Sequence, residues 1–140
     1  MNYITTGWEP FAPFRYFEEI SAVPHGSFNE KAIADYLVKF AEEHGLWSYR
    51  DEHNNVCIKK DASPGCKNMS PMILQSHTDM VCEKNNNVEH DFEKEPLDLY
   101  IEGNILRARG TTLGADNGIG VAYTLAALSD KDAVHPPLEC

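Results

Sequence analysis

The sequence has no long apolar run and no excess of basic residues. Within its 140 residues, no apolar stretch approaches the roughly 18 that a membrane-spanning helix needs. Residues 1–20 lack a basic segment followed by an apolar one, so no secretory signal is expected and the cytoplasm is the predicted location. The net charge is −10, which argues against nucleic acid because its phosphates attract Lys and Arg. We therefore expect neither a membrane nor a nucleic acid as partner.

Cysteine pairs of the C-x-x-C type are also missing, which excludes a zinc knuckle and a thioredoxin-like motif. Reduced thiols in a cytosolic protein are the better interpretation of the four cysteines, Cys57, Cys66, Cys82 and Cys140. The remaining composition, 42% hydrophobic and 24% charged, is ordinary for a globular domain. The chain is long enough to bury a core.

Two helices are predicted in the first third of the chain. Apolar residues at helical spacing mark the first helix in residues 10–23, which Pro24 stops. The second helix is predicted within residues 26–46, where Ser27 and Glu30 form a capping box and Gly45 ends the helix. Its predicted buried stripe consists of Ile33, Leu37, Phe40 and Ala41.

The rest of the chain alternates strands with loops before a last helix. Residues 54–60 predict a strand, and residues 71–81 predict an interior strand because Met72 to Leu74 are continuously apolar. A polar surface loop (83–96), a hairpin (97–110) and a glycine-rich loop that opens a helix (110–130) follow. A further strand starts at Pro137. Helices that precede and follow strands predict an α/β domain.

His77 and Asp79 stand at the end of the predicted interior strand. Side chains two residues apart on a strand point to the same side, so both could face one site. Imidazole is a good Zn²⁺ ligand, and a carboxylate often orients it, although this spacing is a long reach for direct contact. Asp79 could instead tune a catalytic acid. The alternative is that His77 and Asp79 simply end a strand and face solvent. The His-x-Asp pattern taken alone favours this alternative.

Asp116 lies in a loop among four glycines, Gly110, Gly114, Gly118 and Gly120. Glycines let the backbone approach a ligand closely. An N-cap role for Asp116 is the structural alternative. A phosphate loop is disfavoured because the spacing misses both nucleotide-binding patterns and Lys is absent. The loop therefore favours a cation, and a bridging carboxylate can hold two metal ions about 3.5–4 Å apart.

Further metal ligands are scarce in the chain. The remaining histidines have no partner at ligand spacing, and we expect them to be solvated or structural: His25, His44, His53, His90 and His135. The sequence therefore predicts part of a metal site.

Two stretches, "ILQSHTDMVCEK" and "GTTLGADNGIGVA", together resemble the aminoacyl-histidine dipeptidases, the carnosinase-like Xaa-His dipeptidase branch of the M20 metallopeptidases. The resemblance covers nearly the whole chain, including "YFEEISAVP" and "HDFEKEPLDLYIEGNILRARG". It implies that His77 is a zinc ligand, that Asp79 orients and polarises the catalytic site, and that Asp116 bridges two zinc ions. It also implies a cis peptide between Asp116 and Asn117. Ser76 stands where the family commonly has Gly, and it too is small.

The same resemblance implies zinc-dependent hydrolysis of dipeptides such as β-Ala-His in the cytoplasm, with Co²⁺ or Mn²⁺ as possible substitutes for the two Zn²⁺. Residues 1–140 would form the front part of a zinc-peptidase catalytic domain, a mixed β-sheet flanked by helices. The general-base Glu, the other ligands and a lid domain that makes a homodimer are expected beyond residue 140. Alternatives are another M20 peptidase or deacylase, such as a tripeptidase, and a non-catalytic metal-binding scaffold.

Overall fold

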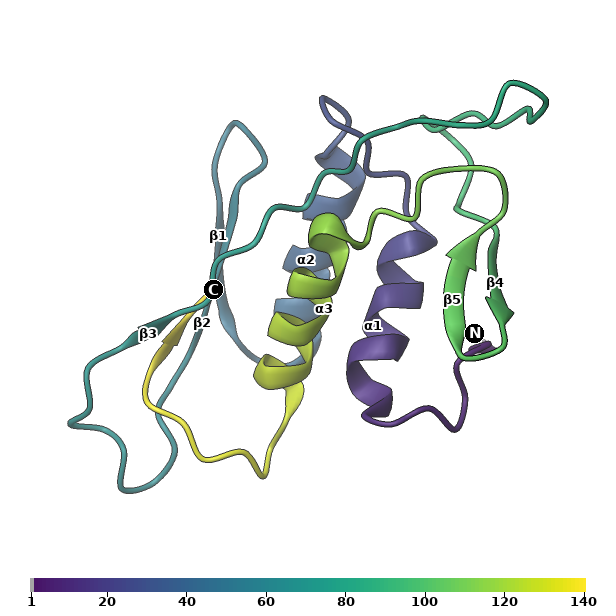
Figure 1. Ribbon diagram of the computed structural model, residues 1–140. Coiled ribbons are helices and arrows are strands. Elements are labelled where there is room, and N and C mark those ends of the chain that lie inside the picture. Colours follow the sequence, from purple (N-terminus) through teal and green to yellow (C-terminus); the bar gives the residue numbers. More distant parts are fainter. Residues whose placement is uncertain (1) are drawn as a thin grey trace.

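The computed structural model describes residues 2–140 (Figure 1). Its helices are α1 (Phe11–Ser21), α2 (Lys31–Glu43) and α3 (Ala115–Ser129). Its strands are β1 (Trp47–Arg50), β2 (Val56–Lys60), β3 (Met72–Ile73), β4 (Leu99–Glu102), β5 (Ile105–Ala108) and β6 (Leu138–Glu139). No helix among the described residues is long and apolar enough to cross a bilayer.

The main sheet has the strand order β1-β2-β6-β3. β2 is antiparallel to both β1 and β6, whereas β3 is parallel to β6. The sheet is therefore mixed, which confirms the predicted α/β class. β4 and β5 form a separate hairpin, as predicted, on the far side of α1 from the sheet (Figure 1).

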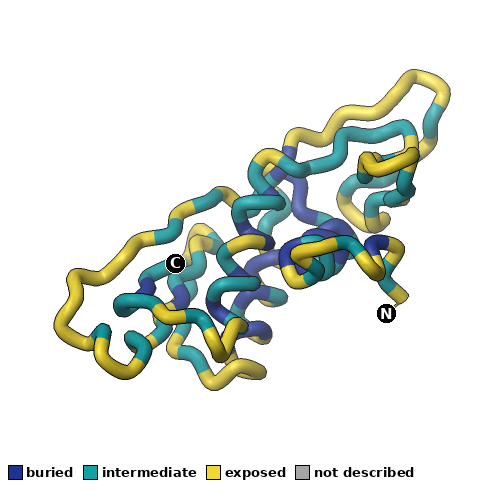
Figure 2. The backbone as a smooth tube through the Cα atoms, turned by 60° about the horizontal axis from the view of Figure 1, so that its bottom comes forward, coloured by how far each residue is buried: buried dark blue, intermediate teal, exposed yellow. Residues whose placement is uncertain are grey.

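The core lies between the helices and the main sheet. α1 packs against α3, and α2 packs against β1 and β2. The largest fully buried side chains come from all three helices and include Tyr16, Ile33 and Leu125. The buried segments of the backbone run through the centre of the molecule, and the exposed loops lie at the two ends of the molecule (Figure 2). The predicted stripe on α2 is confirmed, because all four of its residues are buried.

The start of α2 corrects the predicted capping box. Glu30 occupies the N-cap position, and no side chain caps the helix. The Glu30 carboxylate accepts a hydrogen bond from the Phe28 backbone N–H at 2.7 Å, while the Ser27 hydroxyl donates to Asp79 instead. A carboxylate is a stronger acceptor for a hydroxyl than a neutral group is. The predicted C-terminal stop is confirmed, because Gly45 follows α2 with φ +65°.

The predicted interior strand at Met72 to Leu74 is also wrong. β3 contains two residues and lies at the edge of the described sheet, where the exposed fraction is 50% for Met72 and 73% for Ile73. The chain beyond Leu74 leaves the regular ladder. An apolar run predicts burial only when a neighbouring element covers it, and no described element covers this edge.

The buried Glu18 ties the N-terminal segment to α1. Its carboxylate accepts hydrogen bonds from the backbone N–H groups of Ile4 and Thr5, at 3.0 and 2.9 Å, and from the Thr5 hydroxyl at 2.5 Å. A buried carboxylate is tolerated when donors satisfy its oxygens. The first residues of the chain are thereby fixed beside α1.

Candidate functional site

The structure brings His77, Asp79 and Asp116 together. Nε2 of His77 lies 3.0 Å from Oδ1 of Asp116, and Nδ1 of His77 lies 3.2 Å from Oδ1 of Asp79. Direct contact between His77 and Asp79 is possible because this segment is not a regular strand, in which the spacing would hold them apart. The site therefore joins the segment after β3 to the start of α3.

The hydrogen bonds of His77 fix the direction of its ring. Nδ1 also lies 3.0 Å from the backbone oxygen of Asp79, so both of its neighbours are acceptors and Nδ1 carries the donated proton. Nε2 is left facing the Asp116 carboxylate. Burial opposes protonation of the ring, but hydrogen bonds to Asp116 and Asp79, with their charges, raise the pKa of His77. Either a second ring proton on Nε2 or a bound cation can link Nε2 of His77 to the Asp116 carboxylate.

Ser27 is a member of the site that the sequence did not reveal. Its hydroxyl donates to Oδ2 of Asp79 at 2.5 Å. This hydrogen bond, together with the nearby His77, holds the pKa of Asp79 below its usual range against the effect of burial. The two segments meet because a bridge pairs Gly26 with Met80. Ser27 and Asp79 are 52 residues apart, so no local pattern could have indicated this contact.

The loop at Asp116 has the backbone geometry that its glycines permit. Gly114 precedes α3 with φ +70°, and Asp116 itself is not helical. The peptide between Asp116 and Asn117 is cis, as the family resemblance implied. A Cβ atom on Gly120 would stand 1.8 Å from Oδ1 of Asn117 and 3.2 Å from Cβ of Ser76, so a larger residue there would displace the Asn117 side chain. The Asp116 side chain is 93% exposed, which leaves its carboxylate open to a ligand.

The donor types at this site fit a zinc ion, but only in part. An imidazole nitrogen and a carboxylate oxygen are usual zinc ligands, and Asp79 holds the other ring nitrogen as a supporting carboxylate does. Within residues 2–140, no group of three or more His, Cys, Asp or Glu side chains could hold a metal ion. His77 and Asp116 therefore present two ligands, and their metal-binding role stays a prediction.

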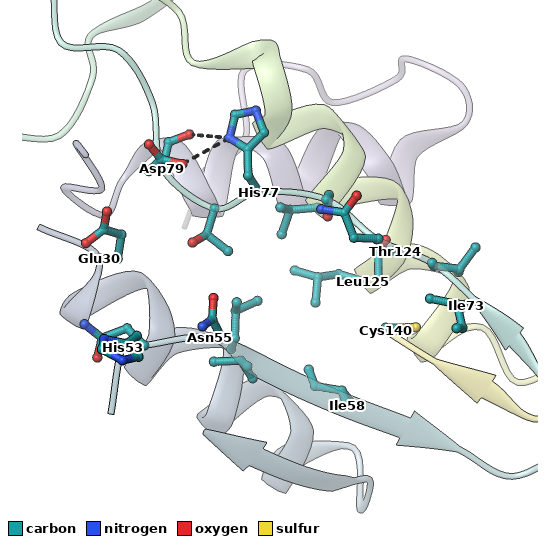
Figure 3. A pocket seen from close by; sticks show the side chains of 18 residues that line it. Glu30, His53, Asn55, Ile58, Ile73, His77, Asp79, Thr124, Leu125 and Cys140 are labelled. Carbon is teal, nitrogen blue, oxygen red and sulfur yellow. Dashed lines mark hydrogen bonds and ion pairs between the residues drawn. The ribbon is translucent and has the colours of Figure 1, made fainter. Parts of the chain in front are cut away.

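A cleft of about 430 Å³ opens beside His77 (Figure 3). One wall is the start of β2 with the residues before it, and the opposite wall is the segment 73–79. Leu125 and Thr124 of α3 lie between the walls, and Cys140 lies at the end away from His77 (Figure 3). The cleft thus follows the sheet and ends at the candidate site.

His25 is a buried structural histidine. A structural role was one of the two roles, solvated or structural, expected for it. Its side chain is almost fully buried, and its Nδ1 donates to the backbone oxygen of Val23 at 2.6 Å. Burial lowers the pKa of His25, while the Val23 hydrogen bond and the charge of Asp79 oppose the shift. The folded protein therefore holds this ring neutral more strongly than the unfolded chain does.

We expect the free energy of unfolding to fall as the pH drops below about 6.5, the ordinary pKa of histidine in an unfolded chain. The unfolded state then binds a proton that the folded state rejects, so His25 contributes a slope of up to about 1.4 kcal/mol per pH unit. This contribution is fully present above pH 6.5 and is lost in acid. Urea denaturation across the pH range should show a smaller slope for His25→Gln than for His53→Gln, whose side chain is exposed. Equal slopes would contradict the assignment.

Comparison with known proteins points to dipeptidases. No protein-family model matches the chain. It is 50% identical over 123 residues to the cytosol non-specific dipeptidase of Escherichia coli K12, covering 88% of this chain and 25% of that protein. It is 45% identical to the crystal structure of aminoacylhistidine dipeptidase from Vibrio alginolyticus, with a TM-score of 0.93, covering 99% of this chain and 28% of that one. The chain thus spans about a quarter of the length of these relatives.

More distant structures share the fold alone. A tripeptidase from Staphylococcus aureus has a TM-score of 0.70 at 19% identity, and the aminopeptidase PepT from Bacillus cereus has a TM-score of 0.71 at 20% identity. Each alignment covers 92% of this chain and 35% of the other. The much higher identity to the two dipeptidases confirms the resemblance drawn from the motifs at His77 and Asp116.

Proposed function

We propose that this chain, which is homologous to part of the aminoacylhistidine dipeptidases, supplies two metal ligands to a zinc-dependent dipeptidase site. The observation that carries the proposal is the convergence of Nε2 of His77 and Oδ1 of Asp116 at 3.0 Å. These atoms come from positions 39 residues apart, and both are ligand types that zinc prefers. The proposed location is the cytosol, in keeping with the Escherichia coli relative.

The proposed roles follow from the contacts of each side chain. His77 and Asp116 bind the metal, with Asp116 exposed enough to bridge two ions. Asp79 is a positioning residue that fixes the His77 tautomer, and Ser27 holds Asp79 in turn. Zinc, when bound, supplies Lewis-acid activation of water and of the scissile carbonyl. The general base and the remaining ligands are proposed to lie outside residues 1–140.

The proposed substrates are unblocked dipeptides of the Xaa-His type, such as β-Ala-His. This choice rests on identity to the dipeptidases rather than on a pocket in the chain. We further propose that the complete enzyme is a homodimer. A panel of dipeptides, tripeptides and acylated amino acids would separate this substrate class from those of other M20 enzymes.

A segment exchange tests the proposed function. The matching segment of the Vibrio alginolyticus dipeptidase is replaced by this chain, which is 45% identical to it. We expect zinc-dependent hydrolysis of β-Ala-His by the chimera, with a loss of at least about a hundredfold on His77→Ala or Asp116→Ala. His44→Ala, at the exposed C-terminal end of α2 and outside the cleft, is the matched control and should leave activity unchanged. A folded chimera whose activity survives both ligand substitutions would contradict the proposal.

The chain alone is expected to show no dipeptidase activity. It presents two of the four ligands that a stable zinc site generally uses, water included. Purified residues 1–140, supplied with zinc, should therefore cleave β-Ala-His no faster than zinc in buffer does. Robust zinc-dependent cleavage that His77→Ala abolishes would overturn this expectation.

A further inference from the structure

We infer that Ser76 is a positioning residue of the candidate site, and that its hydroxyl pairs with the side-chain amide of Asn117. Ser76 precedes the candidate ligand His77, and Asn117 follows the candidate ligand Asp116. A hydrogen bond between Ser76 and Asn117 joins the two segments of the site directly beside each ligand. Its effect on zinc binding rests on the proposed function, whereas the hydrogen bond itself does not.

The side-chain oxygen of Asn117 is buried without a partner. Oδ1 has almost no contact with solvent, and no described residue donates a hydrogen bond to it. Native proteins leave few such atoms unpaired, because an acceptor that loses water and gains no donor lowers stability. The donor is therefore expected among the residues that already enclose this oxygen.

Ser76 packs beside the unpaired oxygen. A Cβ atom on Gly120 would stand 1.8 Å from Oδ1 of Asn117 and 3.2 Å from Cβ of Ser76, so both atoms lie close to one point that glycine leaves empty. Rotation about the Cα–Cβ bond of Ser76 moves its hydroxyl between staggered positions and leaves the backbone in place. We therefore expect one of these positions to bring the hydroxyl within hydrogen-bond distance of Oδ1.

A hydroxyl suits either orientation of the Asn117 amide. Serine both donates and accepts, so Ser76 can donate to Oδ1 or, if the amide turns over, accept from Nδ2. An alanine at position 76 offers neither group. The pairing therefore depends on the hydroxyl of Ser76 and not on the size of its side chain.

The hydrogen bond acts on Asp116 through the backbone. Asp116 and Asn117 both have non-helical backbone angles, so the hydrogen-bond ladder of α3 does not set the direction of their side chains. The Asp116 side chain is 93% exposed, and its contact with the opposite segment is to Nε2 of His77 at 3.0 Å. A second link, one residue along on each segment, limits how far Asp116 and His77 can move apart.

A double-mutant cycle in the metal-free 140-residue chain tests the hydrogen bond. Ser76→Ala should raise the equilibrium constant for unfolding at least about fivefold, because the Asn117 amide loses its partner. The same change should have less than about a twofold effect in the Asn117→Ala background. Ser70→Ala removes the same atoms at an exposed position and should change nothing. Independent effects of the Ser76 and Asn117 substitutions would overturn the inference.

Two further measurements separate positioning from a purely structural role. Nuclear magnetic resonance of the metal-free chain should show that Ser76→Ala shifts the side-chain amide signals of Asn117, whereas Ser70→Ala does not. In the chimera with the Vibrio alginolyticus dipeptidase, Ser76→Ala should lower zinc affinity at least about threefold, and Ser76→Thr, which keeps the hydroxyl, should restore it. Unchanged amide signals would overturn the hydrogen bond, and unchanged zinc affinity would overturn the positioning role.

These outcomes are distinguishable from a failure of the proposed function. A chimera that does not bind zinc through His77 would contradict the proposed function. The double-mutant cycle and the amide signals of Asn117 would still decide the hydrogen bond, because neither measurement involves zinc or dipeptide hydrolysis.

Discussion

Replacement of Phe17 by alanine should lower the free energy of unfolding by about 3–5 kcal/mol, the usual cost of truncating a buried phenylalanine. The Phe17 side chain is 3% exposed, and its ring packs against Gly118, the residue two positions after Asp116. Truncation therefore opens a cavity between α1 and α3 directly beneath the candidate site. Urea denaturation followed by circular dichroism measures the loss.

Phe28 provides the matched control for this change. Its side chain is fully exposed, so Phe28→Ala removes the same ring without opening a cavity. We expect a change within about 0.5 kcal/mol for this variant. A comparable loss for both variants would contradict the attribution of the Phe17→Ala loss to a cavity between α1 and α3.

Replacement of Gly120 by alanine should cost about 1–3 kcal/mol, because the added methyl group overpacks the site. A Cβ atom at this position would stand 1.8 Å from Oδ1 of Asn117 and 3.2 Å from Cβ of Ser76. Asn117 follows Asp116 and Ser76 precedes His77, so the methyl group pushes on both halves of the candidate site. We therefore expect weaker zinc binding as well as lower stability.

The second substitution Asn117→Ala tests this explanation. It removes the side-chain oxygen with which the new methyl group collides. In the Gly120→Ala background it should cost less than it does in the unaltered chain, which gives a favourable coupling in a double-mutant cycle. Strict additivity of the two changes would mean that the loss at Gly120 has another cause.

The helices and the hairpin could be predicted from the sequence because their signals are local. The stripe on α2 and the turn of β4–β5 at Gly103 both follow from residues only a few positions apart. The errors concern contacts that span the chain. Ser27 looked like a helix cap because the sequence gives no sign of Asp79, 52 residues away. The apolar run at β3 looked interior because its spacing does not reveal whether an element covers it.

The candidate site was predictable in its members and not in its geometry. The motifs indicated His77 and Asp116, and the structure places them in hydrogen-bond contact. The direct contact of His77 with Asp79 depends on an irregular segment after β3, which strand periodicity cannot predict. The exposure of Asp116 likewise depends on its non-helical backbone at the start of α3.

The central claim is that His77 and Asp116 hold zinc with the support of Asp79, and calorimetric zinc titration of the 140-residue chain tests it most directly. We expect weak binding that falls at least about tenfold on His77→Ala and on Asp116→Ala. Asp79→Ala should cost about 10–100-fold, as the loss of an orienting partner usually does. His44→Ala, outside the cleft, should change nothing. Unchanged zinc affinity in the His77 and Asp116 variants, with the fold intact, would contradict the claim.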